Sequence, residues 1–221
     1  MILTDPIQIR LTGAGGQGLI TAGIILADAA LLDGRNVIQT QTYGPEARLG
    51  SSKSEVIISR RAIAYPQVRV PDVLLVLSED AAKRYLSAVH ENTLIIIDST
   101  CVSIEGQLGA SPREKVETRC GSETDEGINR LLHTSREKGQ AQCGLKGHVV
   151  LLPITAAAVE LGSKVVANVV ALGALNELAD VVTPGTLRVA VCESVPPRFR
   201  ALNERALERG ASLARAAMSF S

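Results

Sequence analysis

Residues 7–26 read IQIRLTGAGGQGLITAGIIL, and this stretch decides the fold. Apolar and polar residues alternate from Ile7 to Thr12, which predicts a half-buried β-strand. The pattern GxGxxG follows at residues 13–18, and apolar residues at helical spacing then continue to Leu32. A glycine turn between a strand and a helix leaves the first N–H groups of the helix open to an anion. The sequence therefore predicts a βα turn suited to a phosphate group.

A glycine turn of this kind has two other possible roles besides binding a phosphate group: close packing of the helix on the strand, and nicotinamide binding in a dehydrogenase. Glycines at such a junction let the helix and the strand pack closely, with no ligand involved. A nicotinamide-dependent dehydrogenase would use the same turn, but it needs an acidic residue at the end of the second strand, about 20 residues on. Asp33 precedes the expected second strand at residues 37–41, which ends in uncharged residues. No catalytic histidine or Lys–Tyr pair is evident either, so the dehydrogenase is disfavoured.

Composition excludes several classes of protein. The chain has 221 residues, 46% of them hydrophobic, which suits a single α/β domain spanning residues 1–221. Lys plus Arg and Asp plus Glu both total 23 and there is no Trp, so no basic field or stacking platform for nucleic acid is expected. No apolar run reaches the roughly 18 residues that span a membrane, and no signal peptide is recognisable at the N-terminus. The four cysteines lie far apart, which predicts a cytoplasmic chain that holds no metal.

Strand and helix patterns alternate along the rest of the chain. This alternation predicts a three-layer α/β/α fold with a mostly parallel or mixed sheet and a Rossmann-like first βα unit. Thr155 is expected to cap the helix that begins there, and residues 103–147 form an irregular excursion with one helical stretch at 125–136. The expected strands after the first are residues 37–41, 54–59, 72–78, 93–98 and 148–152, and the expected later helices are residues 79–89, 155–178 and 198–218.

A second motif, QTQTYGPEAR, occupies residues 39–48. It places Tyr43, Glu46 and Arg48 directly after a strand, at the edge of an open α/β sheet where ligands bind. These side chains would lie beside the glycine turn if the first two strands are neighbours. The alternative is a rigid Gly-Pro turn with a surface ion pair between Glu46 and Arg48.

The two motifs together resemble the gamma subunit of the 2-oxoacid:ferredoxin oxidoreductases, and the 2-oxoglutarate branch in particular. Leu49 departs from the family pattern, where a glycine is common, and residues 103–147 match nothing in it. Further similar stretches are residues 54–59, 65–66, 71–74, 168–174 and 194–197.

This resemblance implies an enzyme that converts a 2-oxoacid and coenzyme A to acyl-CoA and CO₂ and passes electrons to ferredoxin. Such chemistry needs thiamine diphosphate with Mg²⁺ as an electron sink, and iron–sulfur clusters. The chain has no thiamine diphosphate motif and no cysteine run for a cluster. The resemblance therefore implies that alpha and beta subunits, often with a ferredoxin-like delta subunit, supply the active centre. Alone, the chain is expected to be inert, with no catalytic residue or metal ligand of its own.

Within such a complex, the glycine turn is expected to hold the diphosphate of coenzyme A, with Arg48 adding positive charge. The alternative is a structural assembly subunit that binds no small molecule. The residues expected to form the site are Gly13, Gly15, Gly16, Gln17, Gly18, Tyr43, Glu46 and Arg48.

Overall fold

A six-stranded sheet forms the centre of the molecule. The computed structural model describes residues 4–43, 51–103 and 147–219, and within them the strand order is β2-β3-β1-β4-β5-β6. Strands β1, β4, β5 and β6 run parallel, whereas β3 is antiparallel to both β1 and β2. The sheet is therefore mixed. The strands are β1 (Ile7–Ala14), β2 (Asn36–Tyr43), β3 (Ser51–Ser59), β4 (Val73–Val76), β5 (Leu94–Asp98) and β6 (His148–Leu152).

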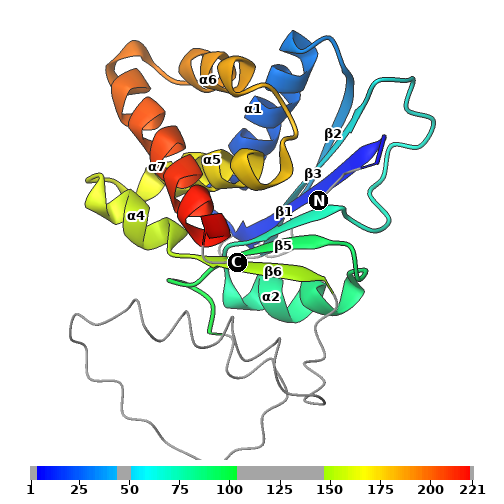
Figure 1. Cartoon of the computed structure of the whole chain (residues 1–221), viewed down its shortest axis with the longest axis horizontal. Coiled ribbons are helices and arrows are strands. Elements are labelled where there is room, and N and C mark those ends of the chain that lie inside the picture. The colour runs from blue at the N-terminus through cyan, green and yellow to red at the C-terminus, as the bar shows by residue number, and fades with distance from the viewer. Residues whose placement is uncertain (1–3, 44–50, 104–146, 220–221) are drawn as a thin grey trace, which may run out of the picture.

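Helices cover both faces of this sheet, which confirms the predicted three-layer architecture (Figure 1). Helix α2 (Glu79–Tyr85) and the short 3₁₀ turn Leu86–Ala88 lie on one face. The other helices gather on the opposite face: α1 (Leu19–Leu32), α4 (Ile154–Glu160), α5 (Ala167–Ala179), α6 (Pro184–Glu193) and α7 (Arg200–Ser219), with 3₁₀ turns at Lys164–Val166 and Pro197–Phe199. None of the helices in the described ranges has the length and hydropathy that crossing a membrane requires.

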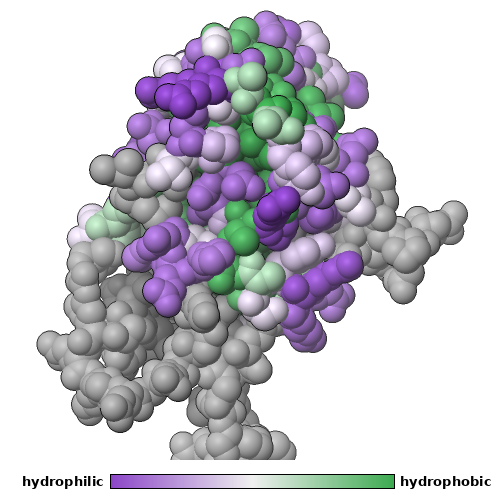
Figure 2. Space-filling view, turned by 90° about the vertical axis from the view of Figure 1, so that its right-hand side faces the viewer, coloured by the Kyte–Doolittle hydropathy of each residue, from purple (hydrophilic) through white to green (hydrophobic). Residues whose placement is uncertain are grey.

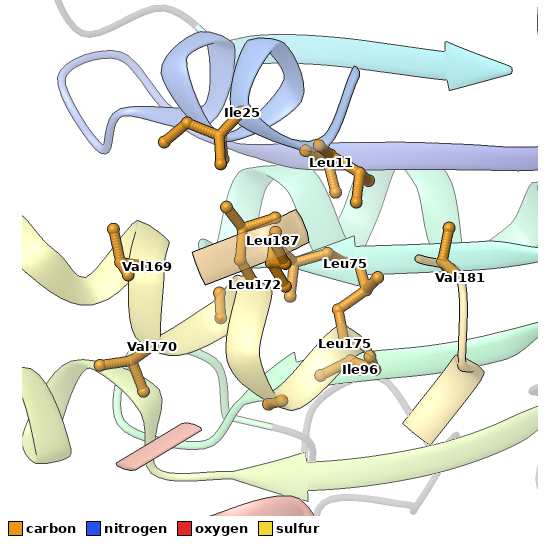
Figure 3. Close-up of a cluster of buried hydrophobic side chains, with 14 of the residues drawn as sticks. Leu11, Ile25, Leu75, Ile96, Val169, Val170, Leu172, Leu175, Val181 and Leu187 are labelled. Carbon is orange, nitrogen blue, oxygen red and sulfur yellow. The ribbon is translucent and has the colours of Figure 1, made fainter. Parts of the chain in front are cut away.

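The main core lies between the sheet and α5. Figure 3 shows Leu11, Leu75 and Ile96 of the sheet close to Leu172 and Leu175 of α5, all of them inaccessible to solvent. The alternate residues of β4 and β5 point to the other face and pack against α2. Because both faces of these strands are covered, their sequences are continuously apolar rather than alternating.

The topology around β1 differs from the simplest expectation. Strand β3 lies between β1 and β2, so these two strands are not neighbours. Instead, β2 and β3 form an antiparallel pair in which Tyr43 is opposite Ser52, and Ser51 is opposite Ala14 of β1. The carboxyl ends of β1 and β2 nevertheless lie at the same edge of the sheet.

The predicted helix at residues 155–178 is wrong in extent. Helix α4 ends near Gly162, whose φ of 93° is in the left-handed region, and α5 begins only at Ala167. Helix α6, which begins with Pro184 in its first turn, was not predicted. The predicted start of α2 is confirmed, because the Ser78 hydroxyl accepts a hydrogen bond of 3.3 Å from the Ala81 N–H. The helical stretch predicted at residues 125–136 lies outside the described residues.

Candidate functional site

The glycine turn joins β1 to α1 and is open to solvent. Gly16 and Gly18 have φ values of 88° and 72°, which a side chain would oppose, and Gly18 is the N-cap of α1. Within the described part of the chain, the backbone N–H groups of Gly15, Gly16 and Gly18 have no hydrogen-bond acceptor. Gly15 and Gly16 are exposed. Among the described residues, the turn therefore presents unpaired donors at the positive end of a 14-residue helix, which favours an anion.

The side chain of Gln17 holds this turn in shape. Its Oε1 accepts a 2.6 Å hydrogen bond from the Ala14 N–H, and its Nε2 donates a 2.9 Å hydrogen bond to the carbonyl of Leu77, just after β4. A Cβ on Gly13 would lie 2.3 Å from Gln17 Oε1, so the amide fits only over a glycine. Both ends of the Gln17 amide are thus used within the protein, and this residue shapes the site rather than reaching into it.

Asn168, in the first turn of α5, fixes the other side of the turn. Its Nδ2 donates a 3.2 Å hydrogen bond to the carbonyl of Gly18, and a Cβ on Gly18 would lie 2.6 Å from that nitrogen. A side chain at Gly13 or Gly18 would therefore displace the amide of Gln17 or of Asn168 from the turn. Gly16 differs, because no atom of the described residues lies within 4 Å of the position that its Cβ would take. At this position the described part of the chain leaves space for a ligand.

The second motif is described only in its first half, residues 39–43, which belong to β2. Tyr43 ends β2, and Ser51, which begins β3, is opposite Ala14 at the start of the turn. Strand β2 therefore ends, and β3 begins, at the edge of the sheet that carries the turn. Glu46 and Arg48 lie outside the described residues.

A buried charge cluster lies on β1 and β3 next to the turn, and it was missed in the sequence. Arg10 Nε is 2.7 Å from Glu55 Oε1, and Lys53 Nζ is 3.1 Å from Glu55 Oε2. Two cations share one carboxylate, so the cluster carries net positive charge, and Lys53 is opposite Thr12, one residue before the turn. The signal was the i, i+2 spacing of Lys53 and Glu55 on one face of a strand. The predicted strand began at residue 54 and left Lys53 out.

At the end of β5, a buried carboxylate joins the sheet to α4. Asp98 Oδ2 accepts hydrogen bonds of 3.2 Å from the N–H and 2.5 Å from the hydroxyl of Thr155. Thr155 therefore lies inside α4 as a donor to Asp98 and does not cap the helix as predicted. Burial raises the pKa of the neighbouring Cys101 thiol, so this cysteine stays protonated and unreactive at neutral pH. In the described ranges, no three His, Cys, Asp or Glu side chains gather as metal ligands would.

A mixed α/β sheet whose first strand leads through a glycine turn into a helix defines an α/β protein with a turn of the anion-binding type. The chain belongs to the pyruvate ferredoxin/flavodoxin oxidoreductase family, whose model matches residues 8–213. The resemblance inferred from the two sequence motifs is thereby confirmed.

Three similar proteins illustrate the match. The 2-oxoglutarate synthase subunit KorC of Methanocaldococcus jannaschii is 34% identical over 209 residues, which are 94% of each chain. The crystal structure of a keto/oxoacid ferredoxin oxidoreductase gamma subunit from Geobacter sulfurreducens is 34% identical with a TM-score of 0.70, covering 96% of this chain and 99% of that one. A 2-oxoglutarate:ferredoxin oxidoreductase from Magnetococcus marinus shares the fold at 20% identity, with a TM-score of 0.71 over 96% of this chain and 32% of that one.

Proposed function

We propose that this chain is the gamma-type subunit of a 2-oxoglutarate:ferredoxin oxidoreductase. The complex would convert 2-oxoglutarate, coenzyme A and oxidised ferredoxin to succinyl-CoA, CO₂ and reduced ferredoxin. Similarity to KorC and to the Geobacter gamma subunit over nearly their whole lengths supports this assignment. Companion alpha, beta and delta subunits supply thiamine diphosphate, Mg²⁺ and the iron–sulfur clusters. This chain contributes binding and assembly, and it is inactive alone.

Within the complex, the glycine turn binds the diphosphate of coenzyme A. The observation that carries this proposal is that the N–H groups of Gly15, Gly16 and Gly18, at the start of α1, have no acceptor among the residues that the structure describes. A diphosphate accepts several hydrogen bonds from such donors, and its charge is stabilised by the helix dipole. The cluster of Arg10, Lys53 and Glu55 adds net positive charge close by. The solved structure of the Magnetococcus protein has 2-oxoglutarate, coenzyme A and succinyl-CoA bound.

Each residue of the turn has a distinct part in this proposal. Gly16 gives the diphosphate its space, while Gln17 and Asn168 hold the backbone of the turn in place. Arg48, from the connection between β2 and β3, contributes a cation, and Tyr43 and Glu46 belong to the same connection. A nicotinamide-dependent dehydrogenase is not supported, since β2 ends without a ribose-binding acid.

A pair of matched variants tests this role. Gly16→Val fills the space in the turn, and Gly34→Val imposes the same kind of backbone strain elsewhere, because Gly34 has a φ of 73° and no atom near its Cβ position. If the variant complex loses two hydrogen bonds to the diphosphate, worth about 1.5 kcal/mol each, coenzyme A binds about 100-fold more weakly. The Michaelis constant for coenzyme A is measured on the assembled complexes.

The control variant, Gly34→Val, should keep the wild-type Michaelis constant for coenzyme A. If Gly16→Val also assembles and keeps that constant, the turn does not bind coenzyme A. The chain would then be a structural assembly subunit.

A further inference from the structure

A concave surface lies at the opposite edge of the sheet from the glycine turn. A groove of about 830 Å³ runs between the start of β1 and residues 60–69, which follow β3. We call it the arginine groove, because Arg60, Arg61 and Arg69 line it together with Tyr65. The connection that forms it lies at the right of Figure 1. Figure 2 looks at that side, where hydrophilic side chains border a narrow strip of hydrophobic residues.

The irregular connection is fastened to the sheet at several points. Arg10 Nη2 donates a 2.7 Å hydrogen bond to the carbonyl of Val68, and the Arg69 N–H donates one of 3.3 Å to Gln8 Oε1. The Arg60 N–H donates one of 2.9 Å to Asp5 Oδ1. The backbone is thus ordered before any partner arrives, which lowers the entropy cost of binding. A connection of this length without regular structure is typically a binding loop.

The side chains of the groove are positively charged and not neutralised. Within the described residues, Arg60, Arg61 and Arg69 form no ion pair with a carboxylate. Asp5 lines the groove too, but its carboxylate accepts hydrogen bonds from the Ser59 hydroxyl and the Arg60 N–H. Three arginines and one carboxylate thus line the groove, which gives it net positive charge. Such a surface attracts an anionic partner.

The aromatic residue in the groove favours a protein partner. The Arg69 guanidinium lies 4.6 Å from the centre of the Tyr65 ring, and Tyr65 is 48% exposed. Arginine and tyrosine are the residue types that most often dominate the energy of protein interfaces. Apolar Ile57 and Ile63 also line the groove, which suits a polypeptide better than a nucleic acid backbone.

We propose that the arginine groove docks an acidic segment of a companion subunit, with Tyr65 as its apolar anchor. The inference rests on the proposed function, since it requires that the chain work within a multi-subunit complex. Because the groove lies at the amino end of β1 and the glycine turn at its carboxyl end, a subunit bound in the groove leaves the turn open. The companion's carboxylates provide the counter-charge that this chain lacks there.

Charge reversal in the complex tests the proposal. A tagged chain carrying Arg60→Glu, Arg61→Glu and Arg69→Glu is compared with one carrying Lys83→Glu, Lys164→Glu and Arg205→Glu, an equal change at exposed positions elsewhere. The amount of companion subunit that copurifies with the groove variant should be lower than with the wild type by a factor of about 10 or more. The control variant should retain as much as the wild type. About 0.5 M salt should weaken the wild-type complex as well. Retention by the groove variant equal to the control overturns the proposal.

A second measurement keeps the test independent of folding. Arg61→Lys preserves the charge and supplies an amine that a carbodiimide couples to a carboxylate in contact with it. A cross-linked peptide that joins position 61 to an acidic residue of a companion subunit is expected. Its absence, in a complex that remains assembled, refutes the docking site. If the wild-type chain copurifies with no companion subunit at all, the proposed function itself fails.

Discussion

A direct backbone contact between two helices of this fold allows a quantitative prediction. Helices α5 and α7 cross at Gly173 and Gly210, where their backbones touch. A Cβ on Gly210 would lie 1.9 Å from the Val170 carbonyl oxygen, and one on Gly173 would lie 2.0 Å from that of Leu207. The obstructing atoms belong to a helix backbone, so no side-chain rotation relieves the clash. The two helices must move apart to accommodate a methyl group.

The perturbation is Gly210→Ala. In an open helical position this change stabilises by about 1 kcal/mol, because alanine is the better helix former. Overpacking opposes this gain, because an extra methyl group in a packed core typically lowers the free energy of unfolding by about 1–3 kcal/mol. The cost at Gly210 should be at the upper end of that range or above it, because the methyl group would clash with backbone atoms. A net loss of about 2 kcal/mol is expected, which lowers Tm by about 4–8 °C in a domain of this size.

Urea unfolding followed by circular dichroism measures the loss, since the chain has no Trp for fluorescence. Gly185→Ala in α6 is the control, because no atom lies within 4 Å of its Cβ position. That variant should be as stable as the wild type or up to about 1 kcal/mol more stable. An unfolding midpoint for Gly210→Ala equal to that of the wild type would refute the argument that this glycine is needed for helix packing.

Two further predictions concern single side chains. Gln17→Ala removes the hydrogen bonds of the Gln17 amide to the Ala14 N–H and the Leu77 carbonyl. The variant should have a free energy of unfolding lower by about 1–3 kcal/mol, measured by urea unfolding. An unchanged unfolding midpoint would show that the turn keeps its shape without the amide. Burial raises the pKa of Asp33, but hydrogen bonds from Thr183 and Thr186 and the nearby Arg35 outweigh it and hold this pKa below the ordinary 3.8. The stabilisation from Asp33 is therefore present above that value and is lost as the pH falls through the lowered pKa. Asp33→Asn should be less stable than the wild type at pH 7, and the difference should disappear below the lowered pKa. A stability difference that persists at low pH would contradict this.

Local signals in the sequence predicted most of the elements. Alternation over residues 7–12, the glycines of the turn and the Ser78 cap each depend on neighbours in the chain, and the structure has β1, the turn and α2 there. The insertion of β3 between β1 and β2 could not be predicted, because an alternating strand does not specify its partner. The end of α4 near Gly162 was not predicted, because the valines that follow continue the apolar pattern of a helix.

The candidate site was predictable only in its backbone. Gly16 and Gly18 stand out in the sequence because positive φ favours glycine, and the structure has them in that conformation. The partners that support them come from distant segments: Leu77 contacts Gln17, and Asn168 contacts Gly18. The cluster of Arg10 and Glu55 likewise depends on strand register. Such contacts follow from tertiary structure, and no spacing in the chain encodes them.

The anchoring of the glycine turn on two sides has a consequence for selectivity. Gln17 ties the turn to the residue that follows β4, and Asn168 ties it to α5, so the protein itself fixes the positions of the N–H groups. The conformational entropy of the loop is lost on folding and does not weaken binding. A turn held on both sides also keeps the spacing of its N–H donors fixed. It should distinguish tetrahedral oxyanions from planar carboxylates by shape, and 2-oxoacids themselves should compete poorly for it.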